Sequence, residues 1–246
     1  MYATAVRRAA LELLAAGRSK RSVSLELGIS RAALRAWAEC PERSLRPPEH
    51  RCWRCNATEC PEPAHYAYLL GQYLGDGYLV TSTRVPKLRV ACANAYPAIA
   101  GEVDTAMTAV SGNRTGAVRQ IGCTDRYCYW MHWPCVFPQH GPGTKHTRPI
   151  VLADWQRDIV REHPWPLIRG LIHSDGCRAV NRVVVRGTTY RYPRYFLSNK
   201  SVDILMIFAD ALDSVGVEWR RNRVDSISVA RRASVALMDE QVGPKC

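Results

Sequence analysis

Long apolar runs are missing from this sequence of 246 residues, and both lysine and acidic residues are scarce in it. No stretch approaches the roughly 18 apolar residues that a membrane helix needs. The apolar stretch near the N-terminus is interrupted by Glu12 and does not have the layout of a secretion signal. We therefore expect an intracellular protein, and we expect its ten cysteines to be thiols or metal ligands rather than disulfides.

Acidic residues are too few to balance the basic ones. The chain has 34 Lys and Arg against 22 Asp and Glu, which gives a net charge of +12 and a pI of about 9.5. Only five of the basic residues are lysines, so arginine dominates, and its flat guanidinium matches phosphates and guanine edges. Hydrophobic residues make up 47% of the chain, enough for a core. This balance favours a polyanionic partner, nucleic acid above all, although a compositional bias of the parent genome would also enrich arginine.

Two short helical patterns lie near the N-terminus. Residues 3–16 place apolar side chains at helical spacing, and Gly17 ends that helix. A second helix ends at Gly28, and Ser30 can cap a third. The spacing is typical of a helix-turn-helix with Arg31 and Arg35 facing the major groove, and an ordinary three-helix packing module is the alternative. The expected core consists of five residues: Leu25, Leu27, Ile29, Leu34 and Trp37.

A proline-rich segment, residues 41–63, separates this region from the rest of the chain. Close pairs of thiolates plus one imidazole can bind a tetrahedral Zn²⁺, and Cys40 or His50 could replace a ligand. Free cysteines in a turn are the alternative. A further group of Cys and His between residues 123 and 146 is irregularly spaced and favours a packed loop over a second metal site. The candidate zinc ligands are Cys52, Cys55, Cys60 and His65.

Two stretches of the chain, residues 69–77 and 168–176, share one pattern. Each is a mostly apolar helix that has small residues four positions apart and ends in Asp-Gly. If the helices pack through these small faces, Asp76 and Asp175 meet at their C-terminal ends. Two carboxylates at adjacent negative helix ends make a natural site for a divalent cation.

Both motifs resemble that of the LAGLIDADG homing-endonuclease family, and the resemblance covers about residues 64–246. Each motif is followed by patterns for two strands, a helix, two strands and a helix. The resemblance implies an α+β fold in which a pseudo-twofold pair of αββαββα halves, residues 64–163 and 164–246, forms a DNA-binding saddle. A small all-α helix-turn-helix domain, residues 1–40, would precede it.

The resemblance also implies the chemistry of the site. Asp76 and Asp175 match the family acids that hold Mg²⁺ or Mn²⁺ for phosphodiester hydrolysis. The motif's sixth position, which varies in the family, holds Leu74 and His173. Basic residues assist in the family, and the candidates are Lys145 and Lys245, each after a Gly-Pro stretch, together with Lys87 and Lys200.

The strands that follow each motif are rich in basic residues and carry no acid. Such strands suit contacts to phosphates and to base edges in the major groove, and a solvated basic sheet face is the alternative. The predicted DNA contacts are Arg84, Lys87, Arg89, Arg178, Arg182, Arg186, Arg191 and Arg194.

We therefore expect a monomeric, sequence-specific double-stranded DNA-binding protein of the cytoplasm and nucleoid, with no membrane and no small-molecule substrate. The leading hypothesis is a freestanding, metal-dependent DNA endonuclease. The alternative is a helix-turn-helix transcription regulator on a non-cleaving LAGLIDADG scaffold, although such relatives carry the reader C-terminally and often lose the acids. An intein is set aside because the chain has no initial Cys or Ser and no final His-Asn. An RNA-splicing maturase fits the helix-turn-helix less well.

Overall fold

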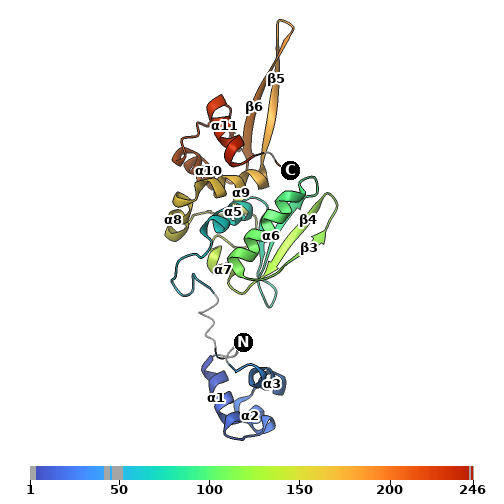
Figure 1. Ribbon diagram of the computed structural model, residues 1–246, viewed down its shortest axis with the longest axis vertical. Helices are drawn as coiled ribbons and strands as arrows, with labels where there is room; N and C mark the ends of the chain where they lie inside the picture. Colours follow the sequence, from blue (N-terminus) through green and yellow to red (C-terminus); the bar gives the residue numbers. More distant parts are fainter. Residues whose placement is uncertain (1–3, 42–44, 46–51, 244, 246) are drawn as a thin grey trace. The chain divides into compact units, whose positions relative to one another are not determined.

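The computed structural model describes residues 4–41, 45, 52–243 and 245. Two compact units make up the chain, Met1–Glu59 and Cys60–Cys246 (Figure 1). His50, the alternative metal ligand, lies outside the described residues, as do residues 42–44 and 46–49 of the proline-rich segment. Among the described residues, no helix combines the length and the apolar character needed to cross a membrane.

The first unit holds three helices: α1 (Thr4–Ala15), α2 (Lys20–Leu27) and α3 (Arg31–Glu39). Gly28 ends α2 with a φ of 64°, and the hydroxyl of Ser30 accepts a hydrogen bond from the backbone N–H of Ala33 at the start of α3. Both caps agree with the sequence pattern. The buried core of this unit comprises Ala10, Val23, Ile29 and Leu34.

Leu25 does not belong to that core, contrary to our expectation, because its side chain is 78% exposed. Val23 and Leu27 lie four positions apart and share the inner face of α2. Leu25 lies midway between them, on the opposite side of the helix. The prediction was wrong because Val23, Leu25 and Leu27 follow one another at a spacing of two, and three residues so spaced cannot all face one side of a helix.

The second unit contains two halves that share the order helix, two strands, helix, two strands, helix. The first half has α5 (Pro63–Leu74), β1 (Gly77–Val80), β2 (Lys87–Ala93), α6 (Pro97–Ser111), β3 (Thr115–Arg119), β4 (Cys123–Tyr129), α7 (Trp133–Val136), η2 (Lys145–Thr147) and α8 (Asp154–Glu162). The second half has α9 (Pro164–Asp175), β5 (Gly176–Val185), β6 (Thr188–Ser198), α10 (Val202–Ser214), β7 (Arg220–Arg223), β8 (Ser226–Val229) and α11 (Arg232–Gln241). The expected α+β fold of two αββαββα halves is confirmed.

Each half forms one antiparallel sheet of four strands, in the orders β1-β2-β4-β3 and β5-β6-β8-β7. Burial alternates along β2, where Leu88, Val90 and Cys92 are buried and the residues between them are not. One face of the sheet therefore packs on helices and the other stays open. The strand expected near Val217 begins three residues later, at Arg220.

The helices α5 and α9 cross at the centre of this unit, where Figure 1 shows them between the two sheets. Their backbones approach closely because glycine stands at the contact points. A Cβ atom added to Gly71 would lie 2.6 Å from the carbonyl oxygen of Leu167, and one added to Gly170 would overlap that of Tyr68. The small residues of the two motifs thus serve the packing that their spacing predicted.

Candidate metal centre and nucleic-acid interface

The crossing of α5 and α9 brings the two motif acids together. Asp76 follows the C-terminal end of α5, and Asp175 is the last residue of α9. A Cβ atom added to Gly75 would lie 3.2 Å from Cγ of Asp175, so the second acid lies against the end of the first helix. Gly77 and Gly176 leave no room for a side chain, since an added Cβ would meet Cα of Tyr73 and Ile172 respectively.

The environment of the two carboxylates disfavours their charged forms. Burial raises the pKa of Asp76 to about 6, and repulsion from Asp175 adds to this effect, while Lys245 and Lys145 oppose it. Burial also raises the pKa of Asp175. Two carboxylates that are partly desolvated and repel each other have a natural counter-charge in a metal cation.

Two lysines lie beside these acids in equivalent positions. The ammonium of Lys145 donates to the carbonyl oxygens of Leu74 and Gly75 at 3.1 and 2.7 Å. The ammonium of Lys245 donates to the carbonyl oxygen of Ser174 at 2.9 Å. These carbonyls end α5 and α9, where a cation stabilises the helix dipole.

Burial lowers the pKa of Lys145 to about 8, although the nearby carboxylates of Asp175 and Asp76 raise it. Burial also lowers the pKa of Lys245. Of the four candidate lysines, these two lie at the acids. Lys87 lies on β2, 5.5 Å from the ring centroids of Tyr127 and Tyr129.

An open pocket of about 400 Å³ adjoins this cluster. The remaining candidate, Lys200, lines the pocket together with Asp175 and Lys145. His146 and Arg148 also line its wall. The pocket can therefore hold a phosphate group next to the acids.

Two αββαββα halves, joined through glycine-lined helices that each end at one paired acid, define a known fold. It is the arrangement that the resemblance of the two motifs to the LAGLIDADG homing endonucleases implies. The two halves and their paired acids agree with that expectation, and the two sheets are the surfaces on which nucleic-acid contacts were predicted.

Three solved structures are similar to this chain at low sequence identity. The homing endonuclease I-DmoI is 14% identical, with 73% of this chain and 96% of I-DmoI covered at a TM-score of 0.44. I-WcaI, solved bound to its DNA recognition sequence, is 12% identical. The match covers 77% of this chain and 85% of I-WcaI, at a TM-score of 0.47. The N-terminal LAGLIDADG domain of DUF199/WhiA is 9% identical. The match covers 74% of this chain and 83% of that domain, at a TM-score of 0.45. No family model and no curated protein matches the sequence.

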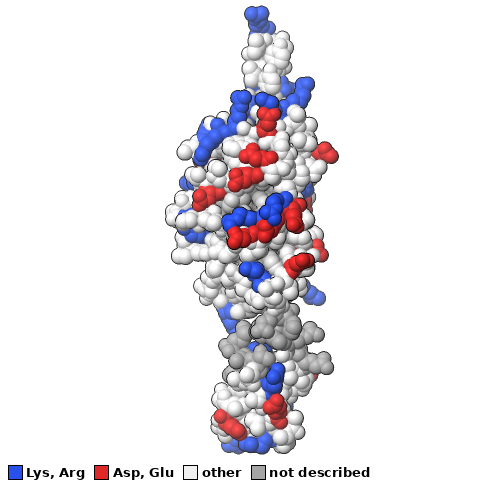
Figure 2. All heavy atoms as spheres, turned by 90° about the vertical axis from the view of Figure 1, so that its left-hand side faces the viewer, with Lys and Arg blue, Asp and Glu red and all other residues white. Residues whose placement is uncertain are grey.

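Acidic residues are almost absent from the two sheets. Asp125 on β4 is the single acid on any strand of the described residues. It is only 5% exposed and accepts hydrogen bonds from Arg89 and from the amide of Gln120. Most acids lie on helices, and Figure 2 shows acidic and basic side chains interspersed on the side of the second unit that carries α8.

The predicted contacts of the first half lie on or near the open face of its sheet. Lys87 and Arg89 point away from the buried side chains of β2. Tyr78 and Tyr127 pair with Arg89 across the sheet and share that face. Arg84 lies in the exposed turn between β1 and β2.

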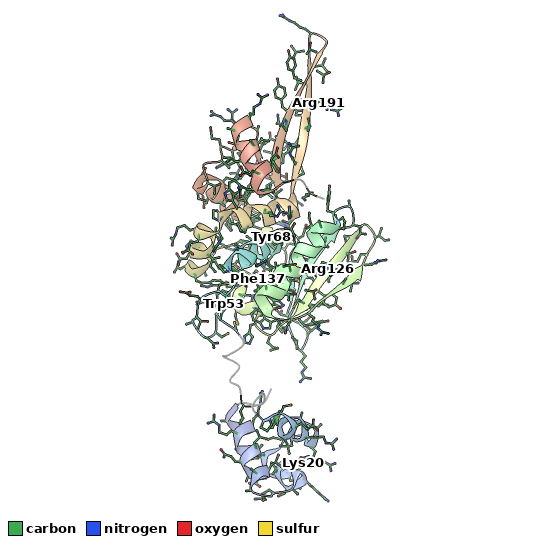
Figure 3. All side chains as sticks on the ribbon, viewed as in Figure 1. Lys20, Trp53, Tyr68, Arg126, Phe137 and Arg191 are labelled. Carbon is green, nitrogen blue, oxygen red and sulfur yellow. The ribbon has the colours of Figure 1, made fainter. Side chains whose placement is uncertain are left out.

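The second half carries a long hairpin, β5–β6, that extends beyond its sheet (Figure 1). Only Tyr195–Ser198 of β6 pair with β8, so residues 179–194 form a two-stranded arm. Arg186 and Gly187 form its tight turn, with φ of 49° and 79°. Arg182 and Arg191 pair directly across the arm, on which Figure 3 labels Arg191.

Two of the five arginines of this hairpin differ from the rest. Arg178 forms a bidentate ion pair with Asp239 of α11, at 2.6 and 2.8 Å, so its guanidinium is engaged on the helical side of the sheet. Arg194 is only partly exposed, and it lies 5.6 Å from the ring centroid of Phe196. The long-range partner Asp239 had no signal in the sequence.

Sequence reasoning missed three arginines on β7. All are exposed, and their strand is the counterpart of β3 in the first half. The cluster Arg-Arg-Asn-Arg was the signal that could have revealed them: Arg220, Arg221 and Arg223.

Arg31 and Arg35 lie one turn apart on α3 of the first unit, and both are exposed. The structure therefore leaves them available for the groove contacts predicted for them.

The predicted zinc ligands fall in both units. Cys52 is buried in the first unit, its thiol interacts with that of Cys55, and burial raises its pKa. Burial raises the pKa of Cys60, in the second unit, to about 11. Nδ1 of His65 lies 3.2 Å from the carboxylate of Glu62. Zinc binding stays a prediction.

Proposed function

We propose that the protein is a site-specific DNA endonuclease that hydrolyses phosphodiester bonds with divalent metal ions held by Asp76 and Asp175. The observation that carries this proposal is the pairing of the two acids at the ends of α5 and α9, with Lys145 and Lys245 beside them. A protein that used the scaffold for binding alone would gain nothing from two desolvated, mutually repelling carboxylates.

The charge of the two sheets indicates the class of substrate. Their strands carry many arginines and a single acid, Asp125, which is already paired. A strand pair with an open basic face fits the major groove of duplex DNA and neutralises phosphates. The exposed arginines of α3 add a second contact to the same polyanion.

The donor set fits Mg²⁺ or Mn²⁺, since carboxylate oxygens are the ligands that both ions prefer. When bound, such an ion polarises the scissile phosphate and lowers the pKa of a water molecule. Asp76 and Asp175 would hold the ions, and each would have to be ionised to do so. Lys145 and Lys245 each place a positive charge beside the acids, where negative charge develops on the phosphate.

Cleavage of a DNA library tests the proposal. Fragmented DNA containing randomised sites is incubated with the wild type and Mg²⁺ or Mn²⁺, and cut ends are sequenced. We expect one enriched site, cut on both strands, and loss of cutting in Asp76→Asn and Asp175→Asn. Asp158→Asn, at an exposed position on α8, is the matched control.

The same experiment separates the alternative function. Specific binding of one DNA site by all variants, without cutting in either metal, would overturn the endonuclease and indicate a transcription regulator on a LAGLIDADG scaffold. Chelation of the metal should leave binding by such a regulator unchanged, because phosphate contacts by arginine need no ion.

A further inference from the structure

Asp175 has a hydrogen-bond partner that fixes its carboxylate. The side-chain nitrogen of Asn199 lies 2.6 Å from Oδ2 of Asp175. The side-chain oxygen of Asn199 accepts a hydrogen bond from the backbone N–H of Ser201 at 2.8 Å. Because only the oxygen can accept that bond, the nitrogen must be the atom that donates to Asp175.

Asn94 occupies the equivalent position in the first half. Each asparagine directly follows the second strand of its half. In each case its backbone N–H donates a hydrogen bond to the residue just before the fourth strand of that half. Asn94 donates to the carbonyl oxygen of Gly122 at 3.1 Å, and Asn199 to that of Asp225 at 2.9 Å. The two positions therefore correspond in the backbone.

The side chains of the two asparagines have different hydrogen-bond partners. The amide oxygen of Asn94 accepts a hydrogen bond from the hydroxyl of Thr124 at 2.7 Å. The residue equivalent to Thr124, two positions after the residue that accepts the backbone hydrogen bond, is Ile227, which has no hydroxyl. Within the described part of the chain, we find no hydrogen bond to the carboxylate of Asp76.

We propose that Asn199 is a positioning residue that makes the two half-sites unequal, because it orients Asp175 while Asp76 has no such partner. This inference rests on the proposed function. With Oδ2 held by the amide, Oδ1 of Asp175 points in a fixed direction. Hydrogen bonds to a ligating carboxylate typically contribute 10- to 100-fold to metal affinity. The half-site of Asp175 therefore binds a divalent cation more tightly, and one DNA strand is cut before the other.

Binding of Mn²⁺ alone tests the first part without DNA. Free Mn²⁺ is followed by electron paramagnetic resonance during titration of the full-length protein. We expect two unequal sites in the wild type, and a loss of roughly 10- to 100-fold in the tighter one for Asn199→Ser. A serine can still accept from the N–H two residues on, which keeps the turn, but it is too short to reach Asp175. Asn94→Ser is the matched control and should change neither site.

The order in which the two DNA strands are cut tests the second part of the proposal. A supercoiled plasmid that carries the cleavage site is cut, and labelled strands are resolved on denaturing gels. The wild type should accumulate a circle nicked on one defined strand, and Asn199→Ser should slow that first cut by roughly 10-fold or more while Asn94→Ser does not.

The outcomes distinguish the two proposals. A wild type that binds no Mn²⁺ and cuts neither strand overturns the proposed function, and this inference with it. A wild type that binds Mn²⁺ and cuts DNA, but in which Asn199→Ser changes neither ion affinity nor strand order, overturns this inference alone. Equal effects of Asn94→Ser and Asn199→Ser would overturn it as well.

Discussion

Gly71 and Gly170 lie against each other where α5 crosses α9, so that a Cβ atom added to Gly170 would lie 3.1 Å from Cα of Gly71. The same added atom would overlap the carbonyl oxygen of Tyr68. Neither contact can relax by rotating a side chain, since both involve backbone atoms. The distance between the two helices, and with it the pairing of Asp76 and Asp175, therefore depends on these glycines.

Gly170→Ala should destabilise the protein by about 3 kcal/mol, the upper end of the range for overpacked cores, because backbone must move to admit the methyl group. Chemical denaturation measured by circular dichroism checks this. Gly101→Ala on α6 is the control: nothing lies within 4 Å of its added Cβ, so alanine should stabilise the helix by about 0.5–1 kcal/mol. Equal stability of the two variants would contradict the close packing of α5 on α9.

The raised pKa of Asp76 predicts how stability depends on pH in metal-free protein. Its pKa is about 6 in the fold and 3.8 in the unfolded chain, so the folded state binds more protons between these values. The free energy of unfolding should therefore fall as pH rises from about 4 to 6. Asp76→Asn should stabilise the metal-free protein at pH 7 by about 1 kcal/mol, after allowance for the solvent exposure of this side chain.

Thermal unfolding at pH 4.5 and 7 measures this effect, with Asp158→Asn on α8 as an exposed control. Addition of Mg²⁺ should reverse the order at pH 7, because only the wild type keeps both carboxylates for the ion. A wild type that is stabilised by rising pH without metal would contradict the electrostatic account of the paired acids.

The lowered pKa of Lys145 predicts an alkaline limit to cleavage. Its value of about 8 means that the ammonium loses its charge above that pH, whereas Asp76 gains its charge near pH 6. At limiting Mg²⁺, where protons compete with the ion for Asp76, the cleavage rate should rise through about pH 6, and it should fall above about pH 8. Lys145→Arg should remove the alkaline fall, since arginine stays charged. Lys145→Met should lose roughly 100-fold in rate, while Arg161→Met on α8 should lose none.

The motif helices and the two acids were predictable because each copy contained its own signal. An apolar face, small residues four apart and a closing Asp-Gly are local in sequence, and the second copy repeated all of them. The helix caps at Gly28 and Ser30 were predictable for the same reason, since a cap depends on neighbouring residues.

What the sequence could not provide were relationships between distant residues. The ion pair of Arg178 with Asp239 joins residues 61 positions apart, and no local pattern encodes it. The different hydrogen-bond partners of Asn94 and Asn199 depend on a hydroxyl that another strand supplies. The length of the β5–β6 arm depends on where β8 stops pairing, which is set by register and not by propensity.

The β5–β6 arm should contribute phosphate contacts that the shorter hairpin of the first half lacks. Arg182 and Arg191 are exposed and pair across the arm, and no acid lies on either strand. Each phosphate contact adds about 0.9 to the slope of log affinity against log salt concentration. Replacement of both residues by glutamine should lower that slope by about 1 to 2 and weaken binding most at low salt.

Fluorescence anisotropy of labelled duplex between about 50 and 200 mM salt measures the slope, with divalent metal chelated so that no cleavage interferes. The matched control is the pair Arg157→Gln and Arg161→Gln on α8, where each arginine already pairs with an acid of its own helix. An unchanged slope in the arm variant, or an equal fall in the α8 variant, would show that the arm does not lie on the phosphates. In that event the second sheet would contact DNA only through its four-stranded part, which packs on helices, and not through the arm.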